Sequence, residues 1–149
     1  MLTQLLAENI GVSQSDIQAL TRLSRAELYE NPTYQNLVND LDFDLLHETL
    51  PIARKVYEST LPAVIEAISD TYRYKGRGMT AFTLGNWLVG FLSQPDQLYQ
   101  LVEYHNRVPL QVIEEGLPMI LKSLGEMEAG GTEWTKAMAV LSLPFFAAK

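Results

Sequence analysis

The chain has 149 residues, a formal net charge of −7 at pH 7 and 47% hydrophobic residues. This length suits one domain, and the hydrophobic content is too high for a disordered chain. The sequence contains no cysteine, which excludes disulfides, thiolate metal sites and cysteine nucleophiles.

The first forty residues predict a series of short helices. Signals that start or stop a helix follow one another closely: Gly11, Ser13, the Ser24-x-x-Glu27 capping box and the Asn31-Pro32 pair. Because short helices are marginal in isolation, we expect residues 1–40 to pack on a helical body formed by residues 43–149.

The rest of the chain also has helical rather than strand periodicity. A long helical pattern runs from Phe43 to Lys75, and further helices are expected near residues 80–93, 95–107, 109–127 and 132–143. The sequence therefore predicts an all-α, single-domain, irregular or orthogonal bundle of about seven to nine helices.

A small residue followed by Leu-Pro recurs four times in this body. The four sites are Thr49-Leu50-Pro51, Thr60-Leu61-Pro62, Gly116-Leu117-Pro118 and Ser142-Leu143-Pro144. Proline is tolerated in the first turn of a helix, and inside a helix it bends the axis. We favour helix starts capped by Thr or Ser; the alternative is a set of kinked helices that line a groove for an apolar ligand.

The N-terminal stretch fits the helix-turn-helix pattern of apolar, small and glycine positions. The matching residues are Leu6, Ala7, Ile10, Gly11, Val12, Ile17 and Leu20. In a DNA-binding protein using residues 6–22, the side chains that face the bases would be Ser13, Gln14, Ser15 and Gln18.

Charge opposes this DNA-binding interpretation. Residues 1–30 carry two arginines, Arg22 and Arg25, against Glu8, Asp16, Glu27 and Glu30. Phosphate contacts dominate DNA affinity, so we expect no tight nucleic-acid binding. We also expect no preceding helix to support the pair.

Two further groups of residues have both a functional and a structural interpretation. Arg73, Lys75 and Arg77 suit a nucleotide or phosphate, but basic residues are also usual at a helix C-terminus before glycine. His105 on an apolar stripe is able to ligate haem iron, although a core histidine is far commoner. We favour the structural interpretation for both and expect no cofactor.

Metal and catalytic motifs are missing from the sequence. The acidic run Asp40–Asp44 resembles the start of a calcium loop, but its later positions do not fit, so we expect no metal site. We see no set of catalytic residues, and we expect a protein that is not an enzyme.

The apolar run at residues 80–92 is hydrophobic nearly all round. Trp87, Gly90 and Phe91 indicate a central helix with one edge available to a second copy of the chain or to an apolar ligand. The sequence has no targeting-type N-terminus and no apolar run of about 18 residues, so we expect a cytoplasmic protein without a membrane span.

Together these features predict a non-enzymatic interaction or regulatory module that self-associates, for example as a homodimer. Two alternatives stay open: a helix-turn-helix DNA-binding regulator, and a binder of an apolar small molecule or cofactor between proline-interrupted helices.

Overall fold

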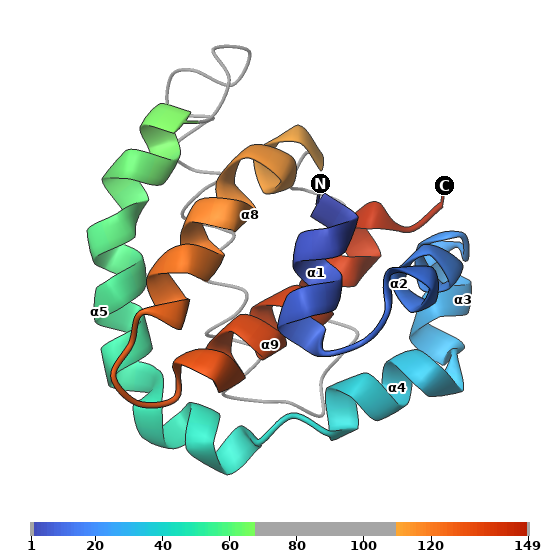
Figure 1. Ribbon diagram of the computed structural model, residues 1–149, viewed down its shortest axis with the longest axis horizontal. Coiled ribbons are helices and arrows are strands. Elements are labelled where there is room, and N and C mark those ends of the chain that lie inside the picture. The colour runs from blue at the N-terminus through green and yellow to red at the C-terminus, as the bar shows by residue number, and fades with distance from the viewer. Residues whose placement is uncertain (1, 68–109, 149) are drawn as a thin grey trace.

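The computed structural model describes residues 2–67 and 110–148, and its regular elements in these ranges are all helical. They are α1 (Leu2–Ile10), α2 (Gln14–Thr21), α3 (Arg25–Glu30), α4 (Pro32–Asn39), α5 (Phe43–Ala67), α8 (Leu110–Gly125), α9 (Gly131–Ser142) and the short 3₁₀ helix η2 (Leu143–Phe146) (Figure 1). The all-α fold class is confirmed. None of the described helices has the length and apolar character needed to cross a membrane.

Polar side chains start the N-terminal helices at the expected positions. Each of four side chains accepts a hydrogen bond from a backbone N–H of the helix that it starts: Ser13, Ser24, Asn31 and Asp42. The side chain of Glu27 also accepts from the Ser24 N–H, which completes the predicted capping box. Asp42, within the acidic run Asp40–Asp44, therefore caps α5.

The helix-start interpretation of the Leu-Pro sites is wrong at three of the four positions. α5 continues through Pro51 and Pro62, and α8 continues through Pro118. Only Pro144 lies in the first turn of a helix, the short η2. Figure 1 shows that α5 bends along its length. This bend is expected because proline has no backbone N–H and so removes one hydrogen bond of the helix.

Three hydroxyl side chains at the Leu-Pro sites donate to the preceding turn and do not cap a following helix. Thr49 and Thr60 each donate a 2.8 Å hydrogen bond to the carbonyl oxygen four residues earlier. Ser142 does the same to Met138 at 2.6 Å. A hydroxyl that donates to the preceding turn lies inside a helix, whereas an N-cap hydroxyl accepts from the following turn.

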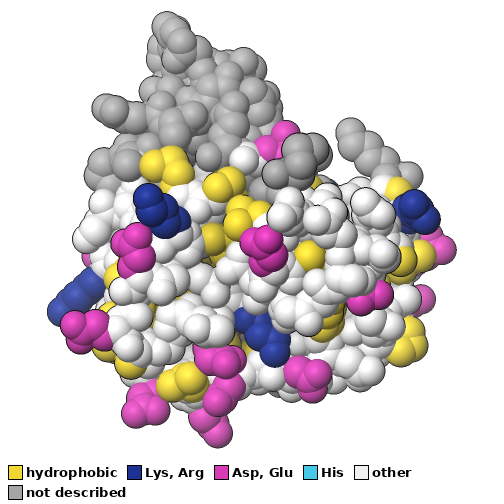
Figure 2. Space-filling view, in the orientation of Figure 1, with side chains coloured by type: hydrophobic (Ala, Val, Ile, Leu, Met, Phe, Trp, Pro, Cys, Tyr) yellow, Lys and Arg dark blue, Asp and Glu magenta, His cyan; other side chains and the backbone are white. Residues whose placement is uncertain are grey.

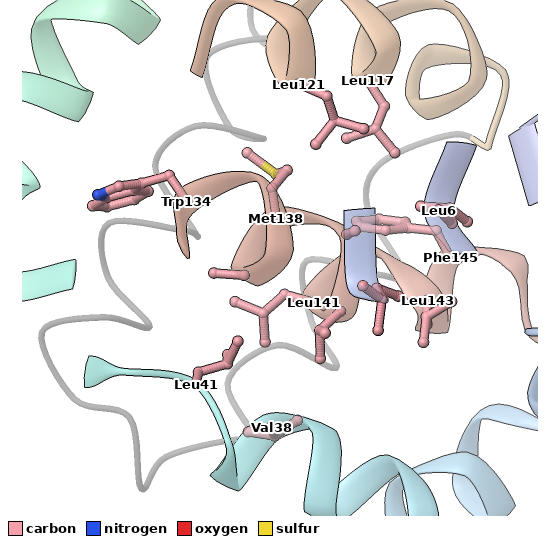
Figure 3. Packing of buried hydrophobic residues seen from close by; sticks show 14 of the residues in the cluster. Leu6, Val38, Leu41, Leu117, Leu121, Trp134, Met138, Leu141, Leu143 and Phe145 are labelled. Carbon is pink, nitrogen blue, oxygen red and sulfur yellow. The ribbon is translucent and has the colours of Figure 1, made fainter. Parts of the chain in front are cut away.

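The core is centred on α9. Trp134 and every residue from Ala137 to Ser142 are buried, and α9 contacts α1, α4, α5 and α8. Figure 3 shows side chains of α1, α4, α8, α9 and η2 gathered in one cluster. α8 buries an apolar stripe at helical spacing, formed by Leu117, Ile120, Leu121 and Leu124. The run 80–92, expected to be central, lies outside the described residues.

The N-terminal helices lie against the C-terminal ones. α1 and α4 pack on α9, whereas α2 and α3 contact η2 (Figure 1). A hydrogen bond from the Ala148 N–H to the Leu23 carbonyl oxygen, 2.8 Å long, fastens the C-terminal segment beside α2. The expected division into residues 1–40 and 43–149 stays a prediction.

Candidate functional site

The site residues expected from the sequence fall into two sets, and the structure describes one of them. Ser13, Gln14, Ser15 and Gln18 all have exposed side chains around the start of α2. The second set lies outside the described residues: Arg73, Lys75, Arg77, Trp87, Gly90, Phe91 and His105.

The turn between α1 and α2 depends on a glycine. Gly11 has a φ of +87°, in the left-handed region that side chains with a Cβ disfavour. The N–H groups of Gly11 and Val12 both donate to the Ala7 carbonyl oxygen, at 2.8 and 3.1 Å, and so close the end of α1. A Cβ added at Gly11 would meet nothing within 4 Å. The glycine is therefore required for the backbone conformation rather than for space.

The apolar positions of the helix-turn-helix pattern face inward. Five of them are no more than 5% exposed: Leu6, Ala7, Ile10, Ile17 and Leu20. Val12 in the turn is half-buried and packs against the same core. The sequence pattern thus corresponds to two helices held together by a shared apolar interior.

Helices from the other end of the chain support this pair. α9 packs on α1 and η2 contacts α2, so the support comes from helices that follow the pair in the chain. The Arg25 Nε donates to the Pro144 carbonyl oxygen at 2.9 Å, which links the start of α3 to η2. Contacts with α1 and with the C-terminal segment therefore hold α2 in place.

The outward face of α2 is polar and carries one arginine near its centre. Gln14, Gln18 and Arg22 follow one another at four-residue spacing, and all three are exposed. Ser15 and Ala19 are exposed beside them. A helix turns by about 100° per residue, so these five residues share one face, which we call the α2 face. The sequence analysis did not place Arg22 and Ala19 on this face, although the spacing from Gln14 and Gln18 indicates it.

Exposed acidic side chains lie on α1, α2 and α3. Glu8, Asp16, Glu27 and Glu30 are exposed. Hydrogen bonds from the Ser24 backbone N–H and hydroxyl lower the pKa of Glu27, which therefore keeps its negative charge. Figure 2 shows acidic side chains spread over the visible face of the molecule, with basic side chains isolated among them.

A second candidate is an open groove between α5 and α8. It consists of two overlapping depressions, of about 370 and 450 Å³, that share Ser59, Thr60, Ser123 and Glu126. Val56, Met119 and Met127 supply apolar surface, and Lys55 and Lys122 supply positive charge. The groove lies between two helices that contain proline.

Within residues 2–67 and 110–148, no group of three or more His, Cys, Asp or Glu side chains is close enough to hold a metal ion. No protein-family model, curated protein or solved structure matches the chain. The α2 face and the α5–α8 groove are therefore interpreted from their own geometry and chemistry.

Proposed function

We propose that the protein is a non-enzymatic regulatory module that binds a macromolecular partner through the α2 face. The observation that supports this proposal is the helix-turn-helix unit itself. Its apolar positions are buried, its turn uses the left-handed Gly11, and its second helix presents a polar surface to solvent. A buried scaffold that holds an exposed polar helix suits recognition of another macromolecule.

Self-association is a separate part of the proposal, and its support comes from the sequence. The apolar run at residues 80–92, with Trp87, Gly90 and Phe91, suits contact with a second copy of the chain. Native mass spectrometry of purified protein tests this part, because it reports the number of subunits. We expect a dimer or higher oligomer; a monomer at all concentrations tested would contradict self-association.

The α2 face is tested by photo-cross-linking. A photoreactive residue replaces Gln18 on the face, or Asn36 on α4, which is equally exposed and serves as a matched control. Both variants are irradiated in an extract of cells that express the chain.

We expect a discrete cross-linked product from position 18 that position 36 does not give. Identical products from both positions, or no product from position 18, would contradict the proposal. Nuclease and protease treatment of the product then shows whether the partner is nucleic acid or protein.

A second candidate function is binding of an apolar small molecule. It is favoured by the α5–α8 groove, where Val56, Met119 and Met127 provide apolar surface at the place expected for proline-interrupted helices. A ligand bound there should appear as extra mass in the native spectrum. Ser123→Trp should remove this mass by filling the groove, whereas the control Asn36→Trp should keep it. Purification of the parent protein without bound mass would contradict this candidate.

A further inference from the structure

We infer that the partner of the α2 face is duplex DNA and that the face reads base edges in the major groove. This inference rests on the proposed function, because it names the partner of the same surface. It assigns the base contacts to Gln14, Ser15, Gln18, Ala19 and Arg22.

The side chains of the α2 face match the chemistry of base edges. A glutamine amide pairs with adenine through two hydrogen bonds, and an arginine pairs with guanine in the same way. Serine bonds to several bases, and an alanine methyl contacts the methyl group of thymine. Gln14, Ser15 and Gln18 make no side-chain hydrogen bonds within the described part of the chain, so their polar groups are free to bind.

The dimensions of α2 also suit the major groove of DNA. An α-helix with its side chains is about 10–12 Å wide, close to the width of about 12 Å of the major groove. Asp16 is six residues from Arg22, which places it about 120° around the helix, at the edge of the face. The centre of the face thus carries positive charge alone, and this charge complements the bases and phosphates.

The low basic charge determines how such a complex would behave. Arg22 and Arg25 are the only basic residues in positions 1–30, and Arg25 already donates to the Pro144 carbonyl oxygen. Each neutralised phosphate contributes about −0.9 to the slope of log K against log salt. With Arg22 assigned to a base edge, about one phosphate contact per copy gives a slope of only about −1. Sequence discrimination would then come from base contacts, and binding to random DNA would be weak, in agreement with the net charge.

The experiment is a selection from a random duplex library at low salt. Purified parent protein, Gln18→Ala and the control Asn36→Ala are compared, after circular dichroism has shown that all three are folded. We expect the parent and Asn36→Ala to enrich the same sequence. Gln18→Ala should bind that sequence about 10- to 100-fold more weakly, the loss typical of one paired base contact. Arg22→Ala should weaken binding and also relax the preference for guanine at the position that Arg22 contacts.

Failure of this inference is distinguishable from failure of the proposed function. No enriched sequence from the folded parent, or equal binding by Gln18→Ala and Asn36→Ala, would overturn the DNA inference. A nuclease-resistant, protein-only cross-link from position 18 would also overturn it while supporting the proposed function. The absence of any cross-link from position 18 would overturn both.

Discussion

We predict that a buried hydrogen bond between α9 and α5 stabilises the folded protein. The Trp134 Nε1 donates to the Thr49 Oγ1 over 2.6 Å, and the same hydroxyl donates to the Leu45 carbonyl oxygen over 2.8 Å. Trp134 is 1% exposed and Thr49 is 5% exposed, so water cannot readily replace a lost partner. The Thr49 hydroxyl, at a Leu-Pro site of α5, therefore also binds α9 through Trp134.

Thr49→Val keeps the shape of the side chain and removes its oxygen. The Trp134 N–H then loses its acceptor, and a buried unsatisfied polar group costs about 1–3 kcal/mol. Thr60→Val is the matched control, because Thr60 occupies the same place in the next Leu-Pro site and its hydroxyl also donates to the preceding turn. Thr60→Val should lower the free energy of unfolding by under about 1 kcal/mol. The Thr60 hydroxyl donates to a carbonyl oxygen that already accepts a hydrogen bond within the helix, so its loss leaves no buried group without a partner.

The assay is urea unfolding of the parent, both single variants, Trp134→Phe and the double variant Thr49→Val/Trp134→Phe. Removing both partners should cost less than the sum of the single changes, by about 0.5–3 kcal/mol, because the unsatisfied donor disappears with the tryptophan. If Thr49→Val costs no more than Thr60→Val, or if the two changes are additive, the hydrogen bond does not stabilise the protein as argued.

Four further predictions follow from the structure and the sequence. Gly11→Ala should lower the free energy of unfolding by about 1–2 kcal/mol, because alanine disfavours the left-handed backbone at φ +87°; unchanged urea midpoints would contradict this. Tyr34→Phe should cost about 0.5–1.5 kcal/mol by removing the hydrogen bond from its hydroxyl to the Val140 carbonyl oxygen, and thermal melts at neutral pH measure the loss. Burial raises the pKa of Tyr34 above its unfolded value, so the stability that depends on its protonated form is complete below about pH 10 and is lost as the pH rises further; Tyr34→Phe should show a shallower alkaline loss, and parallel curves would refute this. Trp87→Ala, outside the described residues, should either cost about 3–5 kcal/mol as a core change or dissociate subunits that stay folded; melts and light scattering like those of the parent would refute the account of the apolar run.

Local signals in the sequence were sufficient to predict the helices at the N-terminus. Capping by Ser13, Ser24 and Asn31 depends on atoms within three residues of each cap, so the spacing alone identifies it. The burial of Ile17 and Leu20 follows in the same way from helical spacing.

The Leu-Pro sites show where local signals fail. A threonine before Leu-Pro is equally suited to cap a new helix or to donate back inside a continuing one. Inside α5, the Thr49 hydroxyl accepts a hydrogen bond from Trp134, which is 85 positions away in the sequence. Packing of this kind stabilises a helix that local propensity disfavours, and no short pattern reveals it.

Part of the candidate site could be predicted from local sequence signals, and part depends on contacts between distant segments. The pattern around Gly11 predicted the pair of helices and the exposed positions that precede and begin α2. The sequence could not show that α9 supports α1, or that η2 contacts α2, because these are contacts between opposite ends of the chain. The position of Arg22 on the α2 face follows from its four-residue spacing from Gln18.

The central claim is that the α2 face contacts the partner, and a matched pair of charge variants tests it most directly. Gln18→Glu and Asn36→Glu add the same negative charge at two exposed positions, so long-range electrostatic effects on binding are similar. The measurement is the affinity of each variant for the partner captured from position 18. The account predicts a loss of about 10-fold or more for Gln18→Glu and little change for Asn36→Glu, since a charge without a partner is costly only inside the contact. Equal losses for the two variants would contradict the claim.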